Sequence, residues 1–280
     1  MPLQLDAVGR TLGPFTHAYD WRDVALYAAA LGAGPEQLTY LLEPSPEVLP
    51  TWTVVPELQP VFAAFKETGL TLARLLHTGQ RVEFLSGFPS RGTVETTAKV
   101  AGIHDMRIGA LVEIETTSSL DGIPRTRSTW SMLVAGVGPF ESPRPPPSPR
   151  VKVPKDVAPD FTTEWTTARN QALLYRLTGD LNPIHARPEA AHEAGLEAPI
   201  LHGLCTYGFA ARAALHALCR DDASRFKTLH SRFTKPVLPG QTLRADGYVT
   251  APGEASITVH VVETGELAMS AALSYSVDPG

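Results

Sequence analysis

The chain has 280 residues, of which 43% are hydrophobic and 19% are charged, as in an ordinary globular protein. Its net charge of −5 argues against nucleic acid as a partner, because phosphate neutralisation needs a basic face. No apolar run approaches the roughly 18 to 20 residues that span a bilayer, so we expect no membrane partner either.

The first half opens with an amphipathic helix predicted over residues 20–31 and ended by Gly32 and Gly34. A strand is predicted over residues 51–55, where Pro56 would end it. Further strands are predicted from their β-branched residues and the turn residues between them, over residues 91–100, 110–117 and 126–137.

A proline-dense stretch, residues 141–154, follows these strands and indicates an extended spacer without a core of its own. We place a domain boundary there, with one domain over residues 1–140 and a second over residues 155–280. The alternative is a long surface loop within a single domain.

The second half is predicted to contain helices over residues 161–177 and 187–194, and a long helix from Gly203 to Leu218. Strands are predicted after it, over residues 227–234, 241–250, 255–263 and 267–277. The first half shows a weaker version of this order, and the segment from His77 echoes the segment from His230. We infer an internal duplication.

The loop from Asp180 to His185 concentrates the candidate chemistry. Gly179 and Pro183 interrupt helical geometry, so Asp180, Asn182 and His185 can converge on one volume. A carboxylate and an imidazole in such a volume can hold and deprotonate a water. The alternative is structural: Asp180 and Asn182 would bond local backbone, and His185 would only pack.

Gly203 is the second candidate, because a backbone N–H at the start of a long helix is a free donor at its positive end. Such a donor suits an oxyanion hole, although a glycine can also simply ease a tight turn. Zinc-binding, nucleophile-elbow and phosphate-loop motifs are missing from the sequence, so we expect no metal and no cofactor.

Compartment is inferred from the termini and the cysteines. The N-terminus lacks a basic region followed by an apolar stretch, and the C-terminus lacks an S-K-L address. Cys205 and Cys219 lie in one predicted helix about 20 Å apart, too far to bridge. We expect two reduced, buried thiols and a cytoplasmic protein.

The residues from Tyr175 to His185, followed by those from Pro199 to Cys205, resemble the signature of the MaoC-like, type-2 (R-specific) enoyl-CoA hydratases. Segments around Arg22, His77 and Phe233 extend the likeness to the two-domain form found in multifunctional enzyme type 2. The resemblance implies an α+β double hotdog, in which two antiparallel sheets each wrap a helix.

The resemblance also implies a hydro-lyase of fatty acid metabolism that hydrates trans-2-enoyl-CoA to (R)-3-hydroxyacyl-CoA. Asp180 and His185 would be its catalytic pair, Asn182 their organiser, and Gly203 the holder of the thioester oxygen. Further contacts to the acyl-CoA substrate are implied for His77, Thr78, Arg107, Leu181, Pro183, Ile184 and Phe233. The first half, which lacks the catalytic loop, would accommodate the acyl chain, and a homodimer is expected.

Two departures from the family pattern affect the first half. Thr78 stands where the family has a glycine, and Asp105-Met106 stands where the family often has an Asp-Lys pair, so Arg107 would have to supply the charge. Three alternative functions stay open: a dehydratase acting on acyl carrier protein, a hydratase for bulky substrates, and a non-catalytic acyl-CoA-binding protein.

Overall fold

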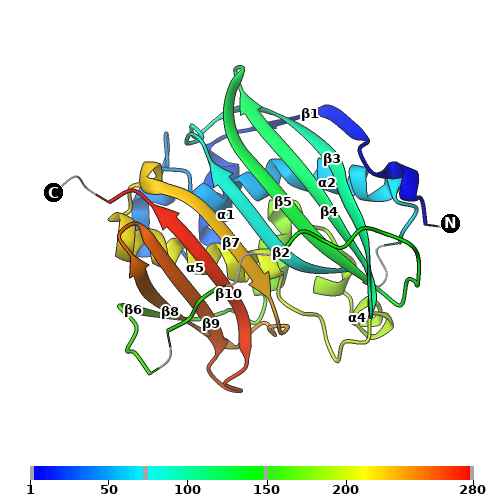
Figure 1. The fold of residues 1–280 in the computed structure, drawn as a ribbon. Coiled ribbons are helices and arrows are strands. Elements are labelled where there is room, and N and C mark those ends of the chain that lie inside the picture. The colour runs from blue at the N-terminus through cyan, green and yellow to red at the C-terminus, as the bar shows by residue number, and fades with distance from the viewer. Residues whose placement is uncertain (1–2, 72–74, 148–150, 155, 278–280) are drawn as a thin grey trace.

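A computed structural model describes residues 3–71, 75–147, 151–154 and 156–277. Within these residues, one curved antiparallel sheet runs through the molecule in the order β1-β3-β4-β5-β2-β7-β10-β9-β8-β6. The helices lie behind this sheet in the view of Figure 1. The strands are β1 Thr11–Tyr19, β2 Leu75–Phe84, β3 Gly92–Met106, β4 Gly109–Leu120, β5 Ile123–Ala135, β6 Phe161–Thr166, β7 Phe226–Phe233, β8 Thr242–Ala251, β9 Glu254–Val261 and β10 Leu267–Tyr275.

The strand order is the same in both halves. It reads β1-β3-β4-β5-β2 in the first half and, taken from the opposite edge, β6-β8-β9-β10-β7 in the second. The halves meet where β2 pairs with β7, from Gly79 opposite Arg232 to Glu83 opposite Thr228. The expected double hotdog is therefore confirmed, and the duplication is visible in the topology.

Each half wraps its sheet around one main helix. In the first half α2 (Val54–Glu67) packs against β1, β3 and β4, and in the second half α5 (Gly203–Cys219) packs against β7, β8, β9 and β10. The shorter helices are α1 (Trp21–Ala30), α3 (Gln171–Tyr175) and α4 (Pro188–Glu193). At Gly208 of α5, an added Cβ would lie 2.5 Å from the Leu31 methyl groups, so a larger residue would require Leu31 to move.

The strand predicted over residues 51–55 is wrong. Pro50–Thr53 forms a 3₁₀ turn that runs directly into α2, and Pro56 is in the first turn of that helix, where no N–H is needed. The β-branched residues favoured a strand locally. Burial of Val54, Leu58 and Val61 on one helical face overrides that preference.

The single helix predicted over residues 161–177 is also wrong. Residues 161–166 form the edge strand β6, which pairs with β8, and only Gln171–Tyr175 are helical as α3. Partly buried and exposed side chains alternate along β6, a period of two that the apolar spacing of Trp165, Ala168 and Ala172 concealed.

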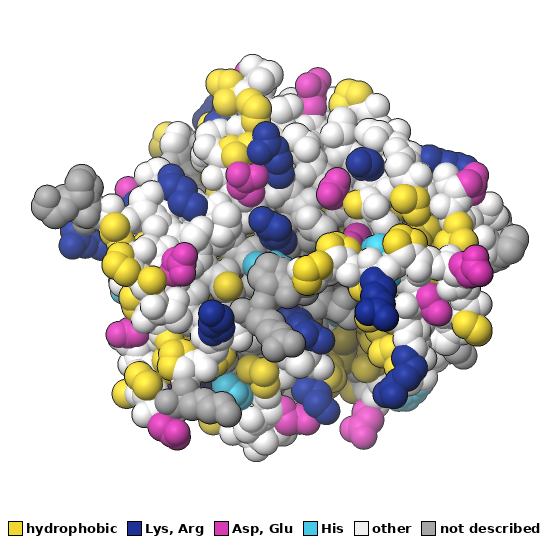
Figure 2. All heavy atoms as spheres, viewed as in Figure 1, with side chains coloured by type: hydrophobic (Ala, Val, Ile, Leu, Met, Phe, Trp, Pro, Cys, Tyr) yellow, Lys and Arg dark blue, Asp and Glu magenta, His cyan; other side chains and the backbone are white. Residues whose placement is uncertain are grey.

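The described part of the proline-rich spacer is extended and attached to both halves. Ser142 accepts a hydrogen bond from the Asp105 N–H at 2.7 Å, and the Lys152 carbonyl accepts one from Ser256 at 2.8 Å. Residues 148–150 lie outside the described residues. Figure 2 shows this outer face of the sheet, where acidic and basic side chains are interspersed.

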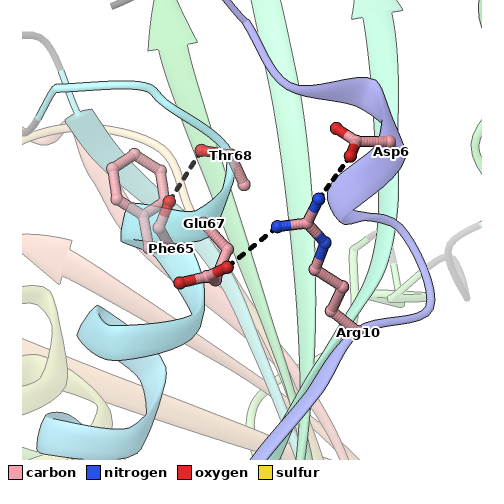
Figure 3. A network of polar contacts seen from close by, with 5 residues as sticks. All are labelled: Asp6, Arg10, Phe65, Glu67 and Thr68. Carbon is pink, nitrogen blue, oxygen red and sulfur yellow. Dashed lines mark hydrogen bonds and ion pairs between the residues drawn. The ribbon is translucent and has the colours of Figure 1, made fainter.

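The N-terminal segment is joined to the end of α2 by surface ion pairs. Arg10 lies between Asp6 and Glu67, with 3.0 Å to the Glu67 carboxylate, and Thr68 caps the end of the helix by donating to the Phe65 carbonyl at 2.7 Å (Figure 3).

Among the described residues no helix is long and apolar enough to cross a membrane. Cys205 and Cys219 are free and buried, as expected.

Candidate active site

One pocket of about 270 Å³ brings the sequence candidates together across the seam between the halves. The first half contributes Leu58, Val61, His77, Trp130 and Met132 to its wall. The second half contributes Asp180, Asn182, His185, Gly203 and Phe233. The pocket is therefore apolar on one side and carries an acid, an amide and an imidazole on the other.

The loop that carries these groups is held by its own side chains. Gly179 adopts a φ of 129°, which favours glycine and lets the chain turn away from helical geometry before Asp180. The Asp180 carboxylate accepts from the Asn182 N–H at 3.1 Å, and the Asn182 side-chain oxygen accepts from the Ile184 N–H at 3.3 Å. The backbone bonds expected of a purely structural loop are thus present, yet the Asp180 and Asn182 side chains still line the pocket.

His185 has a defined tautomer. Its Nδ1 lies 2.8 Å from the Ile200 carbonyl, which can only accept, so Nδ1 carries the proton and Nε2 keeps its lone pair. Burial lowers the pKa of His185, against the opposing charge of Asp180. At neutral pH the imidazole is therefore uncharged and can take a proton at Nε2.

His202 is a site residue that was absent from the sequence candidates, although it directly precedes Gly203. It is 1% exposed, its ring stacks on His185 with centroids 3.7 Å apart, and its Nε2 donates to the Asp180 carbonyl at 3.2 Å. Burial first, and then His185 and Arg176, lower its pKa to about 2. His202 therefore stays neutral, and it holds both the Asp180 backbone and the His185 ring in place.

The side-chain oxygen of Asp180 and the ring nitrogens of His185 and His202 lie within 4.8 Å of one another. These residue types can bind a metal. However, the two rings are stacked 3.7 Å apart and inclined by only 25°, so their lone pairs lie in two nearly parallel planes, which disfavours both rings binding one ion. The arrangement suits hydrogen bonding to a small polar molecule.

Gly203 is the first residue of α5, so its N–H is one of the donors that a helix leaves unpaired at its positive end. The Phe233 ring lies over it, where an added Cβ would come within 3.3 Å of the ring carbons. His77 packs against Phe233 with ring centroids 5.0 Å apart. The donor thus faces the pocket beside an aromatic wall.

The other sequence candidates divide into two groups. Thr78 and Ile184 line the pocket, and the Thr78 hydroxyl donates to the Ser131 carbonyl at 3.0 Å. Leu181 is 61% exposed, Pro183 is exposed, and Arg107 lies in the exposed turn between β3 and β4. These three are not among the residues that line the pocket.

The fold is a double hotdog, and among its described residues Asp180 and His185 lie in one pocket at the seam between the halves. Two family models match the chain: the MaoC like domain over residues 152–271 and the MFE-2 hydratase 2 N-terminal domain over residues 17–136. The chain belongs to the MaoC-like hydratase 2 family, in its two-domain form.

Individual relatives are similar over nearly the whole chain. A probable enoyl-CoA hydratase 2 from Dictyostelium discoideum is 36% identical over 254 residues, which cover 88% of this chain and 86% of the relative. The crystal structure of a MaoC-like dehydratase from Phytophthora capsici has a TM-score of 0.89 at 28% identity and covers 99% of both chains. Full-length peroxisomal multifunctional enzyme type 2 from Drosophila melanogaster has a TM-score of 0.78 at 32% identity, covering 94% of this chain and 48% of that one.

Proposed function

We propose that this protein is a hydro-lyase that reversibly hydrates trans-2-enoyl-CoA to (R)-3-hydroxyacyl-CoA in fatty acid metabolism. The observation that carries the proposal is the meeting of Asp180, a neutral His185 and the start of α5 in one pocket. Membership of the hydratase 2 family supports the substrate class.

In the proposed mechanism, the thioester oxygen accepts a hydrogen bond from the Gly203 N–H. The positive end of α5 stabilises the enolate-like charge that develops there as water adds. The side-chain amide N–H₂ of Asn182 stays available to the pocket, because only its oxygen bonds the Ile184 N–H.

A water held between Asp180 and His185 adds its oxygen to C3 while the pair takes one of the water's protons. The C2–C3 π electrons pass to the thioester as an enolate, and the pair returns one proton to C2 from the same face, so both groups end in their starting protonation states. His185 Nε2 is free to accept a proton, while the nearby carboxylate of Asp180 stabilises the imidazolium that would form. Because an Asp180 oxygen and the ring nitrogens of His185 and His202 lie within 4.8 Å of one another, one water can contact both Asp180 and His185. His202 holds the catalytic loop in place through the Asp180 carbonyl and orients the His185 ring by stacking on it.

The first half supplies the apolar wall for the acyl chain, through Leu58, Val61, Trp130 and Met132. No metal or cofactor takes part in the proposed reaction, since the CoA thioester is itself the substrate. A homodimer, a cytoplasmic location and the division into two domains around the proline-rich spacer remain predictions from the sequence.

Hydration of a short enoyl-CoA, followed by loss of its absorbance, tests the proposal. Asp180→Asn removes the carboxylate charge and should lower kcat by about 10²–10⁴-fold, the usual contribution of an acid–base group. Asp121→Asn is the matched control, because Asp121 is exposed in a turn at φ 54°, which asparagine also adopts. Full activity in Asp180→Asn, or product that an (R)-specific dehydrogenase does not oxidise, would contradict the proposal.

A further inference from the structure

The pocket has an exposed mouth and a buried inner end. Exposed residues at the mouth include Leu76, Lys235 and Pro236. Among the buried lining residues of the first half, Trp130 and Met132 of β5 are each 2% exposed. An acyl chain that passes the catalytic loop and runs into the first half therefore meets the Trp130 indole.

Glu57 lies directly behind this indole and is fully buried. One of its carboxyl oxygens accepts from the Trp130 Nε1–H at 2.8 Å. The other accepts from the hydroxyls of Thr53 and Ser128 at 2.9 and 2.8 Å. Burial raises the pKa of Glu57, and the surrounding donors oppose the shift. The buried Glu57 carboxylate is thus bonded by specific donors, one of which is the Trp130 indole.

The core around Trp130 contains a network of buried, paired polar side chains among its apolar residues. Thr53 bonds Thr126 at 2.7 Å, and Thr96 bonds Ser118 at 2.9 Å, all buried. An alkyl chain pushed into this region would separate paired polar groups and leave them unsatisfied, at about 1–3 kcal/mol for each group. The first half therefore lines one side of the acyl site but gives the acyl chain no path beyond Trp130.

The indole is also fixed from the pocket side. The His77 imidazole stacks on Trp130 with centroids 5.1 Å apart and planes inclined by 9°, and it packs in turn against Phe233. Burial lowers the pKa of His77 to about 4, so the ring is neutral and can stack without a charge. Rings thus line the pocket continuously from Gly203 to Trp130.

We propose that Trp130, held in place by Glu57, forms the floor of the acyl pocket and restricts the enzyme to short-chain enoyl thioesters. This inference rests on the proposed hydratase function. It narrows the expectation that the first half accommodates the acyl chain, because it ends the accessible part at Trp130. Trp130 is then a specificity-determining residue, and Glu57 is a positioning residue that acts through it. The pocket that Trp130 helps to line has a volume of about 270 Å³.

The test is the ratio of kcat/KM for hexadecenoyl-CoA to that for crotonyl-CoA. Wild-type protein should prefer crotonyl-CoA, and Trp130→Ala should raise the ratio about tenfold or more, since each added methylene that finds an apolar site is worth about tenfold or more. Trp130→Phe keeps a smaller ring and should raise the ratio less. It remains informative if the alanine variant does not fold. Trp165→Ala, in β6 and away from the pocket lining, should leave the ratio unchanged.

Glu57 is tested by a pair of variants. Glu57→Gln keeps an oxygen that can accept from the indole and should retain the wild-type ratio, whereas Glu57→Ala frees the ring and should raise it. Equal ratios in both would overturn the positioning role, because a merely structural residue would change stability and not chain-length preference. If wild-type protein prefers hexadecenoyl-CoA, or if neither folded Trp130 variant changes the kcat/KM ratio, Trp130 does not form the floor of the acyl pocket. Failure of wild-type protein to hydrate any enoyl-CoA would instead refute the proposed function.

Discussion

The two halves share one strand order but differ in what surrounds their main helices. At the start of α5, Gly203 opens the backbone to the pocket, and the loop before it carries Asp180 and His185. At the start of α2, Glu57 is buried under Trp130 and a set of hydroxyls. The helix start faces the pocket in one half and is closed by side chains in the other.

The two halves of a duplicated fold can therefore take different roles. A single acid–base site needs one loop and one helix N-terminus, so the equivalent positions of the other repeat are free to change. In this chain the first half contributes apolar residues to the pocket wall, which the proposed function assigns to the acyl chain. The account therefore predicts that changes in the second half alter turnover, whereas changes in the first half alter substrate range or only stability.

After the catalytic loop itself, the largest loss of turnover is expected at Gly203. Gly203→Ala adds a Cβ 3.3 Å from the Phe233 ring and crowds the thioester at the proposed oxyanion donor. The Gly203→Ala variant keeps the backbone N–H, but a thioester oxygen displaced from it loses what the removal of one oxyanion donor costs, about 10²–10³-fold in kcat. Gly87→Ala in the first half is the control, because its added Cβ meets nothing within 4 Å. Similar kcat values in the two variants would break the contrast between the halves.

Acid should destabilise both halves through buried neutral histidines. The native pKa is about 4 for His77 and about 2 for His202, below the usual 6.5, so the unfolded chain binds more protons between these limits. The stabilisation is present above pH 6.5 and is lost as pH falls, by up to about 1.4 kcal/mol per pH unit for each histidine.

Urea unfolding of wild-type protein and His77→Gln, at pH values from 7 to 4.5, measures the His77 share. The variant should lose the proton uptake of one group and depend less steeply on pH. Because Glu57 has the opposite shift, the difference between the two proteins is the relevant quantity. Parallel pH profiles would show that His77 is not a buried neutral group.

The smallest effect is expected at Arg10, whose ion pairs with Asp6 and Glu67 are on the surface of the first half (Figure 3). Exposed pairs of this kind contribute little because solvent screens them. Arg10→Ala should change neither kcat nor the chain-length ratio, and should move the urea midpoint only slightly. A large loss of activity would mean that this edge of the first half communicates with the site.

Much of the site was predictable from the sequence because it is local. Asp180, Asn182, His185 and Gly203 occupy a loop and a helix start whose glycine and proline positions indicate the backbone geometry. His202 could have been found by its place beside Gly203. Its role depends on stacking with His185 across a turn, which spacing alone does not show.

The first half was harder to predict, for physical reasons. Gly13 and Pro14 interrupt β1, and Pro56 and Pro60 lie inside α2, so proline patterns pointed away from both elements. The contact of Glu57 with Trp130 joins residues 73 positions apart and is invisible to any local pattern. The fold class could be predicted nonetheless, because the resemblance to a known family implies it.

The central claim is that chemistry resides in the Asp180–His185 loop, and one comparison tests it directly. His185→Gln removes the imidazole that lines the pocket, whereas His192→Gln makes the same change on exposed α4, seven residues along the chain. With crotonyl-CoA, the account predicts a kcat about 10²–10⁴-fold below wild type for His185→Gln and wild-type turnover for His192→Gln. Folded His185→Gln protein that hydrates crotonyl-CoA at the wild-type rate would contradict it.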